Sequence, residues 1–248
     1  MDEEIRPVAL VTGAGRGLGA AIARSLAANG WPVAVNDLAV DPQEVVDQVR
    51  TAGGVASGFI ADVTDELAVV TLVAEVAERL GPIEALVVNA SGPQPPIGVA
   101  ELTWADHLDQ LRFFVKSPTL LVQAVLPAMR ERRRGRIINL GSDLVERAAP
   151  RLSAYSAAKA AQLALTRTWA RELGPHGITV NLVAPGWIPV ERHDGTPLEV
   201  FQAYRDEVPL GRLGTPSDVA AAVVYLASDA AGFVTGARIA VNGGHIVS

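Results

Sequence analysis

The stretch Thr-Gly-Ala-Gly-Arg-Gly-Leu-Gly, residues 12–19, follows a short apolar run and precedes an alanine-rich helical pattern. Glycines let a backbone turn sharply and approach a ligand closely, and a helix N-terminus favours negative charge. The spacing of Gly13, Gly17 and Gly19 fits T-G-x-x-x-G-x-G, whereas Leu18 excludes the commoner G-x-G-x-x-G. Because the loop joins a strand to a helix, we expect it to bind the pyrophosphate of a dinucleotide; an ordinary tight turn is the alternative.

Apolar, strand-like runs alternate with helical patterns along the whole chain. Short runs of this kind are typical of parallel strands that are buried on both faces of a sheet. The expected strands are Pro7–Val11, Pro32–Val35, Ser57–Ile60, Ala85–Val88, Arg136–Leu140, Ile178–Val183 and Arg238–Val241. The expected helices are Leu18–Ala28, Pro42–Ala52, long stretches after Trp104, and Ser153–Leu173. The alternation predicts an α/β fold with a doubly wound parallel sheet and helices on both faces.

The chain shows no linker, internal repeat or low-complexity tract, so we expect a single domain over residues 1–248. The segment from about 187 to 214 is rich in proline, glycine and charge. Long connections of this composition are often functional, and we expect this one to be a mobile lid over a substrate.

Composition excludes several classes of protein. Apolar residues make up 49% of the chain and charged residues 19%, which suits a large buried core. The net charge of −6 argues against a nucleic-acid partner. There is no cysteine, and the four histidines lack metal-ligand spacing, so we expect no disulfide and no metal site. The acidic start MDEEIRP is unlike a signal peptide and no apolar run could cross a bilayer, so we expect a cytoplasmic protein without membrane attachment.

Asp37 closes the second expected strand, in the run VAVNDL. An acidic residue about 20 positions after a glycine-rich loop accepts hydrogen bonds from the ribose hydroxyls of a bound dinucleotide. A carboxylate there repels a 2′-phosphate, so NAD is favoured as the cofactor. Arg16 could pair with that phosphate, so NADP remains an alternative. A solvated turn residue is the other interpretation of Asp37.

Tyr155 and Lys159 lie four residues apart in the helical stretch SAYSAAKAA, so they share one helix face. A tyrosine ionises near pH 10, and a nearby ammonium lowers that pKa by favouring the phenolate, at about 1.4 kcal/mol for each unit. Ser142 follows the strand-like run RIINL, where a hydroxyl would face the ligand crevice of a parallel sheet. These residues suggest an acid/base pair with a group that polarises a carbonyl; a surface pair and a helix cap are the alternatives.

The same motifs occur in order in a known family. They are TGAGRGLG (12–19), Asp62–Val63 within ADVTD, VVNAS (87–91), the set Ser142, Tyr155 and Lys159, NLVAPGW (181–187), PLGRLGTPSDVA (209–220) and VTGARIAVNGG (234–244). Over nearly its whole length the chain resembles the short-chain dehydrogenase/reductase family, in its one-domain form of roughly 250 residues. The resemblance implies a Rossmann-like fold, a homotetramer or homodimer, and a secondary alcohol or ketone as a small-molecule substrate.

The resemblance also assigns roles to residues. Tyr155 would be the general acid/base, Lys159 would bind the nicotinamide ribose and tune Tyr155, and Ser142 would polarise the carbonyl. Asp62 and Val63 would hold the adenine. The cofactor-binding residues implied in full are Gly13, Arg16, Gly17, Leu18, Gly19, Asp37, Asp62, Val63, Asn89, Ala90, Tyr155, Lys159, Pro185, Gly186 and Ile188.

Three positions depart from the family pattern. The family's N-N-A-G reads VNAS at residues 88–91, and a usual threonine is Val190. The family's catalytic asparagine, which helps to hold a water behind the lysine, is replaced by Phe114 after a short insertion downstream of Trp104. Phenylalanine cannot hold water, so either the proton leaves by another path or catalysis is weak. If the alignment across the insertion is displaced, Gln110, Arg112 or Lys116 would hold that water instead.

Two hypotheses about function follow. The first is an enzyme that transfers a hydride between NAD and a secondary alcohol or ketone, with 3-oxoacyl thioesters, sugars and polyols as candidate substrates. The second is a non-catalytic dinucleotide-binding protein, a sensor or scaffold, which Phe114 favours and the retained Ser142, Tyr155 and Lys159 oppose. We expect the substrate pocket to be walled by residues 92–99, residues 144–151 and the lid.

Overall fold

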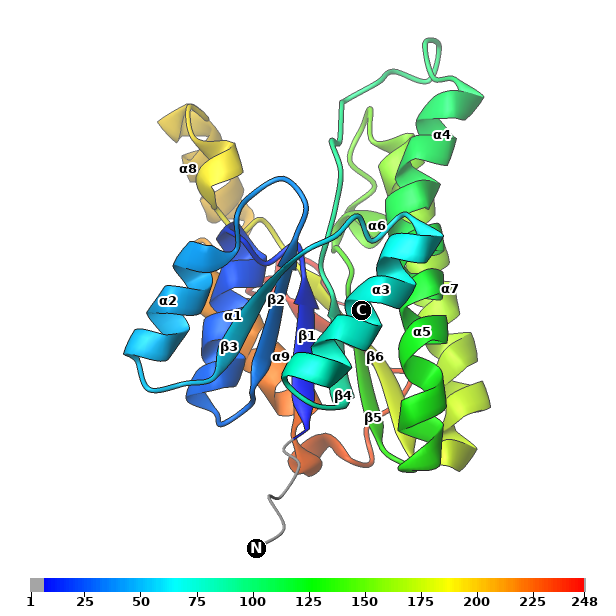
Figure 1. Cartoon of the computed structure of the whole chain (residues 1–248). Coiled ribbons are helices and arrows are strands. Elements are labelled where there is room, and N and C mark those ends of the chain that lie inside the picture. Colours follow the sequence, from blue (N-terminus) through cyan, green and yellow to red (C-terminus); the bar gives the residue numbers. More distant parts are fainter. Residues whose placement is uncertain (1–6, 248) are drawn as a thin grey trace, which may run out of the picture.

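The computed structural model describes residues 7–247, and their seven strands form one parallel sheet (Figure 1). The strand order is β3-β2-β1-β4-β5-β6-β7. The strands are β1 (Val8–Thr12), β2 (Val33–Asp37), β3 (Ala56–Ile60), β4 (Ile83–Val88), β5 (Gly135–Leu140), β6 (Ile178–Pro185) and β7 (Arg238–Val241). The expected doubly wound parallel sheet is therefore confirmed. The acidic start MDEEIRP, which was compared with a signal peptide, lies outside the described residues except for Pro7.

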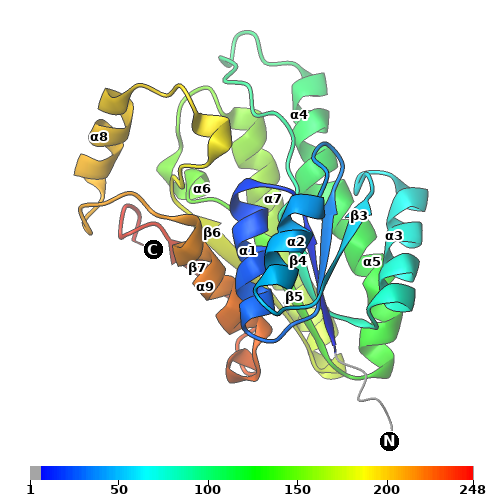
Figure 2. The same ribbon diagram turned by 60° about the vertical axis from the view of Figure 1, so that its left-hand side comes forward.

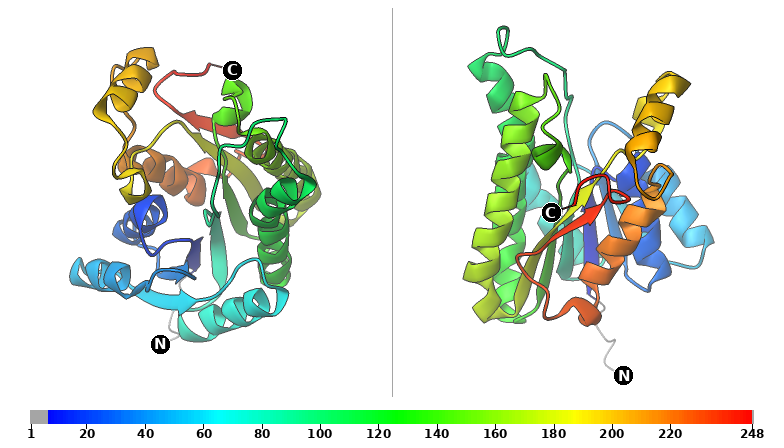
Figure 3. Two further views of the ribbon diagram at one scale, coloured as in Figure 1. Left: turned by 90° about the horizontal axis from the view of Figure 1, so that it is seen from above. Right: turned by 180° about the vertical axis from the view of Figure 1, so that it is seen from behind.

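Helices cover both faces of the sheet (Figures 2 and 3). They are α1 (Gly17–Ala28), α2 (Gln43–Thr51), α3 (Glu66–Arg79), α4 (Trp104–Leu111), α5 (Ser117–Glu131), α6 (Leu144–Arg147), α7 (Ser153–Leu173), α8 (Leu198–Glu207) and α9 (Pro216–Ala227). Short helical turns are η1 (Arg112–Lys116), η2 (Gly174–His176), η3 (Glu191–His193) and η4 (Asp229–Ala231). Residues of α1, α2 and α9 pack on one face, and residues of α3, α5 and α7 pack on the other.

The central strands show why the sheet needs cover on both sides. In β1, Ala9 and Val11 belong to the hydrophobic cluster with α1 and α9, whereas Val8 and Leu10 belong to the cluster with α3 and α5. Successive side chains of a strand point to opposite faces, so an unbroken apolar run supplies both cores at once. Burial of each such side chain contributes roughly 1.5–3 kcal/mol, which makes the double layer the stable arrangement.

The strand order places a ligand crevice at the carboxyl edge of the sheet. β1 pairs with β4, although β2 and β3 lie between them in sequence. The connections after β1 and after β4 therefore leave toward opposite faces, and a dinucleotide binds at such a switch point. The glycine-rich loop, Asn89, Ser142 and Gly186 follow the carboxyl ends of β1, β4, β5 and β6.

Helices α4 and α5 are joined through a π-helical turn, η1, at Arg112–Lys116. The backbone of Arg112 and of Ser117 stays in the right-handed helical region, so one rod runs from α4 into α5. A π turn accommodates an extra residue within a helix and occurs frequently at functional sites. The insertion that the sequence indicates downstream of Trp104 fits this turn.

The segment expected to be a lid contains its own structure, because η3 and α8 lie within it. α8 and the first turns of α4 rise beyond the carboxyl edge on opposite sides of the molecule (Figures 1 and 3). Of the helices within residues 7–247, none has the length and apolar character that a membrane span requires.

Candidate active site

Two positions of the glycine-rich loop lie so close to neighbouring backbone atoms that a side chain would not fit. Gly13 has φ +61°, and a Cβ atom built there would lie 2.8 Å from Cα of Ala90. A Cβ atom on Gly19 would lie 2.2 Å from the carbonyl oxygen of Gly13. Helix α1 begins at Gly17, and the preceding Arg16 makes no side-chain cap. The first backbone amides of α1 are therefore available to an anionic ligand.

Thr12 and Asn89 fasten this loop to β4. The amide nitrogen of the Asn89 side chain donates hydrogen bonds to the carbonyl oxygens of Thr12 and Gly13, both at 2.9 Å. The hydroxyl of Thr12 accepts from the backbone amides of Asn89 and Ala90, at 3.0 and 3.1 Å. Asn89 and Ala90 thus lie beside the loop, and their hydrogen bonds hold its shape.

Asp37 lies at the end of β2 and is half-buried. Its Oδ2 accepts a hydrogen bond from the amide of Gly15 at 3.0 Å. Its Oδ1 accepts from the amides of Ala39 and Val40, at 3.0 and 3.2 Å. The carboxylate therefore joins the glycine loop to the turn after β2, which a solvated turn residue would not do.

Asp62 and Val63 follow β3 and differ in exposure. Val63 is buried in the core beneath α3. Partial burial acts to raise the pKa of Asp62, but hydrogen bonds from Thr64 and the charges of Arg112 and Lys116 outweigh it and hold that pKa below its usual value. Arg112 lies 3.6 Å from Asp62, so the π turn contacts the edge of the expected adenine site.

Tyr155 and Lys159 lie on the buried face of α7. The ammonium of Lys159 donates a hydrogen bond to the carbonyl oxygen of Leu140, the last residue of β5, and lies 3.2 Å from Oε1 of Gln162. The main-chain carbonyl oxygen of Gln162 accepts a hydrogen bond from the hydroxyl of Thr166, and that hydroxyl accepts one from the side-chain amide of Asn139. The side-chain oxygen of Gln162 and the carbonyl oxygen of Leu140 therefore accept from Lys159, whereas Thr166, held by Asn139, binds the main chain of Gln162 behind it.

Ser142 follows β5 by two residues, so it lies at the same strand end as the Lys159 ammonium. Its side chain is buried, and its Oγ accepts a hydrogen bond from the amide of Leu144 at 3.2 Å. Because that bond uses an oxygen lone pair, the hydroxyl proton can be directed at a substrate oxygen.

The carboxyl end of β6 supplies the residues expected on the nicotinamide side. Pro185 and Ile188 are buried, and Ile188 packs in the core with α9. A Cβ atom on Gly186 would lie 2.6 Å from the hydroxyl oxygen of Tyr204, which belongs to α8. That hydroxyl accepts a hydrogen bond from the amide of Trp187 at 2.8 Å, and burial raises the pKa of Tyr204, so it stays a neutral phenol.

A cavity of about 280 Å³ opens onto Tyr155. Its lining comes from the loop after β4, from α4 and η1, and from the start of α7. The lining residues are Pro93, Gln94, Pro95, Ile97, Leu102, Asp106, Asp109, Gln110, Phe113, Arg151, Leu152, Ala154 and Tyr155. The expected wall from residues 92–99 is present, and Arg151 of the expected wall 144–151 contributes. The lid lines no part of this cavity, and α4, which sequence reasoning did not assign to it, forms a whole wall.

The segment expected to be a lid approaches the glycine-rich loop instead. A Cβ atom on Gly17 would lie 3.3 Å from Oε2 of Glu191 and 3.6 Å from Cβ of Val190. The start of the segment from 187 to 214 therefore approaches the N-terminus of α1, which is the place expected for the pyrophosphate.

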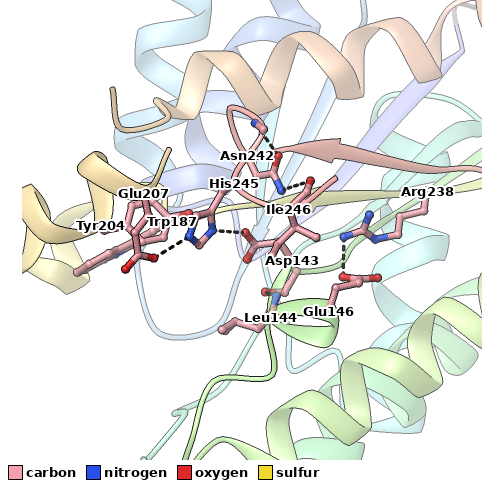
Figure 4. A network of polar contacts seen from close by, with 12 residues as sticks. Asp143, Leu144, Glu146, Trp187, Tyr204, Glu207, Arg238, Asn242, His245 and Ile246 are labelled. Atoms are coloured by element: carbon pink, nitrogen blue, oxygen red, sulfur yellow. Dashed lines mark hydrogen bonds and ion pairs between the residues drawn. The ribbon is translucent and has the colours of Figure 1, made fainter. Parts of the chain in front are cut away.

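A polar cluster ties the lid to the strand end that carries Ser142 (Figure 4). Nδ1 of His245 lies 3.4 Å from Oδ2 of Asp143, and its Nε2 lies 3.1 Å from Oε2 of Glu207 in α8. The His245 ring also packs on Tyr204, with ring centroids 4.6 Å apart. Sequence reasoning did not find this cluster, because its members come from segments 38 and 102 residues away from His245.

No group of three or more histidine, aspartate or glutamate side chains within residues 7–247 could hold a metal ion.

Comparison with known proteins identifies the family. A family model described as Enoyl-(Acyl carrier protein) reductase matches residues 13–245. The chain belongs to the short-chain dehydrogenase/reductase family. It is 39% identical to a cis-4-hydroxycyclohexanecarboxylate dehydrogenase of Sinomonas cyclohexanicum, with 96% of each chain covered. It is 38% identical to a cyclohexanol dehydrogenase of Rhodococcus, with 96% of this chain and 95% of the relative covered.

A solved structure shows the same fold. The 3-oxoacyl (acyl-carrier-protein) reductase of Agrobacterium tumefaciens, with NADP bound, has a TM-score of 0.89 and 33% identity, over 97% of this chain and 95% of that chain. Members of this oxidoreductase family bind a nicotinamide dinucleotide, and the cradle of Gly13, Gly19 and Asp37 fits such a group.

Phe114 distinguishes this short-chain dehydrogenase/reductase from its family pattern. Its ring is 1% exposed, stands perpendicular to the Tyr155 ring at 5.4 Å, and has the Lys159 ammonium 3.8 Å from its centroid. Arg112 and Lys116 turn instead toward acidic residues after β3. Sequence reasoning considered only that Phe114 excludes water. The structure adds that an aromatic face attracts the ammonium, which compensates for part of that exclusion.

Phe114→Asn should lower the free energy of unfolding by about 3 kcal/mol, since a buried aromatic ring is lost. It should also move the alkaline rise of kcat/KM for alcohol oxidation toward neutral pH, because water admitted beside Lys159 solvates its ammonium. Phe114→Leu is the control: it keeps the site dry, removes the ring face, and should move the rise to higher pH. Profiles of kcat/KM against pH that coincide for all three proteins would show that Phe114 has no influence on proton transfer.

Proposed function

We propose that this chain interconverts a small, uncharged secondary alcohol and its ketone, with NAD as the hydride partner. The observation that supports this most strongly is the position of Tyr155, which lines the cavity and packs against Phe114, whose ring also faces the Lys159 ammonium. A cavity of about 280 Å³ is slightly smaller than the roughly 300–1,000 Å³ of pockets for drug-sized ligands. A compact ring therefore suits it better than a long chain.

The relatives support a six-membered carbocyclic alcohol as the substrate class. Two of them are named for dehydrogenation of hydroxylated cyclohexanes, one of which is uncharged and one of which bears a carboxylate. Both names support the six-membered ring, and only the first supports an uncharged substrate. The cavity wall is mainly apolar, with Pro93, Ile97, Leu102, Phe113 and Leu152 among its residues. Such a surface packs against ring carbons. A 3-oxoacyl thioester would place only the short end of its chain in this space.

The cofactor would lie along the carboxyl edge. Residues 13–19 would hold its pyrophosphate, Asp37 its adenosine ribose, Asp62 and Val63 its adenine, and Asn89, Ala90, Pro185, Gly186 and Ile188 the remainder. When bound, the nicotinamide supplies or accepts the hydride. Among described residues, Oδ2 of Asp37 accepts one hydrogen bond, from Gly15, which leaves capacity for a ribose hydroxyl.

The protein's own groups would handle the proton and the developing charge. The Tyr155 oxygen would take the proton of the carbinol during oxidation and return it during reduction. The Lys159 ammonium favours the anionic form of the neighbouring tyrosine. Ser142 would donate its hydroxyl proton to the substrate oxygen, since its Oγ already accepts from Leu144. The buried contacts around Tyr155 and Lys159 support an enzyme over the alternative of a non-catalytic binding protein.

Tyr155→Phe removes only the hydroxyl that transfers the proton. It should reduce kcat for cyclohexanol oxidation by at least about 100-fold, while the NAD dissociation constant changes little. Lys159→Ala should reduce kcat and raise the NAD dissociation constant, because Lys159 would also contact the ribose. Tyr225→Phe is the matched control, since Tyr225 is an exposed tyrosine on α9. Unchanged turnover in Tyr155→Phe would refute the mechanism.

The choice between NAD and NADP tests Asp37 against Arg16. Asp37→Ala should improve the use of NADP and weaken the binding of NAD. It also removes the hydrogen bonds from the amides of Gly15, Ala39 and Val40. Asp37→Asn keeps an acceptor oxygen and removes the charge, so the ratio of kcat/KM for NADP to that for NAD should rise at least roughly tenfold. A wild-type protein that binds NADP tenfold more tightly than NAD would show that Arg16 outweighs Asp37.

We also propose that the chain is a homodimer or homotetramer that associates through α4 and α7. On α4, Trp104 and Leu108 lie one turn apart and are 68% and 49% exposed. On α7 the outward residues Ala157, Ala160 and Ala164 are small, which permits close approach of helices. Sedimentation velocity should show an oligomer that Trp104→Glu dissociates; a wild-type monomer at all concentrations would contradict this.

A further inference from the structure

We propose that Gln110 selects substrates that carry a second hydroxyl group, which donates a hydrogen bond to its side-chain oxygen. This inference rests on the proposed function and names the substrate more narrowly. Gln110 lies in the last turn of α4, is 5% exposed, and lines the cavity that opens onto Tyr155. Its Oε1 is buried and has no hydrogen-bond partner within residues 7–247.

The orientation of the Gln110 amide is set by the protein. Its Nε2 donates a hydrogen bond to the carbonyl oxygen of Pro93 at 2.9 Å. A rotated amide would place Oε1 against that carbonyl, so that two acceptors would face each other. The amide nitrogen is therefore engaged with the loop after β4, and the oxygen is left as an acceptor. A buried acceptor without a donor is unfavourable, and a ligand that brings a donor removes this cost.

The charges around Gln110 favour a neutral donor over a carboxylate. Asp106, one turn earlier on α4, and Asp109 line the same cavity, against the single cation Arg151. Hydrogen bonds from Thr103 lower the pKa of Asp106, so it is ionised at neutral pH. Arg151 donates one of its bonds to the carbonyl oxygen of Pro96. Two aspartates beside one guanidinium disfavour an anionic substituent, while the few carboxylate and amide oxygens of this part of the wall accept hydroxyl donors.

These observations describe a compact diol as the substrate class. One secondary carbinol would lie at Tyr155, and the second hydroxyl would reach Gln110 across the apolar ring contacts. A site that accepts a hydrogen bond from a substrate hydroxyl discriminates against an analogue that lacks it, because the buried acceptor is then left unpaired. For a neutral pair we expect a preference of about 10- to 100-fold in kcat/KM.

The test compares the cyclohexane-1,2-, 1,3- and 1,4-diols with the methylcyclohexanols of the same substitution. The wild-type enzyme should prefer at least one diol by tenfold or more, mainly through KM. Gln110→Leu should lose that preference and use the methylcyclohexanol better, and Gln110→Met, which keeps the chain length, should behave in the same way if Leu disturbs folding. Gln123→Leu, at an exposed position of α5, is the matched control and should change neither rate. An equal preference in wild type and both Gln110 variants would overturn the inference.

Calorimetric titration of the same diols into the NADH-loaded enzyme separates this inference from the proposed function. Diol binding that weakens tenfold in Gln110→Met, without any oxidation, would support the role of Gln110 and refute the alcohol dehydrogenase activity. Oxidation of cyclohexanol with no advantage for any diol, in rate or in binding, would support the activity and refute the role of Gln110.

Discussion

The parallel pairing of β1 with β4 is the constraint on which the rest of the site depends. Because the two strands end side by side, Thr12 and Asn89 can exchange hydrogen bonds across the switch point. These bonds hold the glycine loop in a shape that leaves no room for a Cβ atom at Gly13 or Gly19. The same edge then receives Asp37 from β2, Ser142 from β5 and Gly186 from β6. Each of these residues is ordinary alone, and the strand order brings them together.

Lys159 shows how this chain departs from its family without losing a buried cation. A lone ammonium inside a protein is unfavourable unless hydrogen bonds and charges compensate for lost water. Here the compensation comes from the carbonyl of Leu140, from Gln162, and from the face of Phe114. The main chain of Gln162 also accepts from Thr166, which accepts from Asn139, so polar groups of α7 and β5 meet behind Lys159.

Most of the fold could be predicted from sequence, because unbroken β-branched runs and helical stretches alternate so regularly. The observed strand bounds differ from the predicted ones by one or two residues. β4 begins at Ile83 instead of Ala85, and β6 ends at Pro185 instead of Val183. Local motifs mark part of the candidate site in the sequence, at residues 12–19, Asp37, Tyr155 and Lys159. The cavity wall on α4 and the bridge from Asp143 through His245 to Glu207 were not, since they depend on contacts between distant segments that no spacing rule encodes.

The π turn at Arg112–Lys116 has a consequence for how such a protein can change. Each residue of an α-helix advances the side chains by about 100°, so one extra residue rotates everything before it relative to everything after it. α5 packs against the sheet. α4, on the other side of the extra residue, presents Gln110 and Asp106 to the cavity. Loss or gain of a single residue here would turn a new side of α4 toward the cavity and would also shift Phe114, which lies within the turn, against Tyr155 and Lys159. A single mutational step would therefore alter the cavity wall and the surroundings of the Tyr155–Lys159 pair together, while the sheet stays in place.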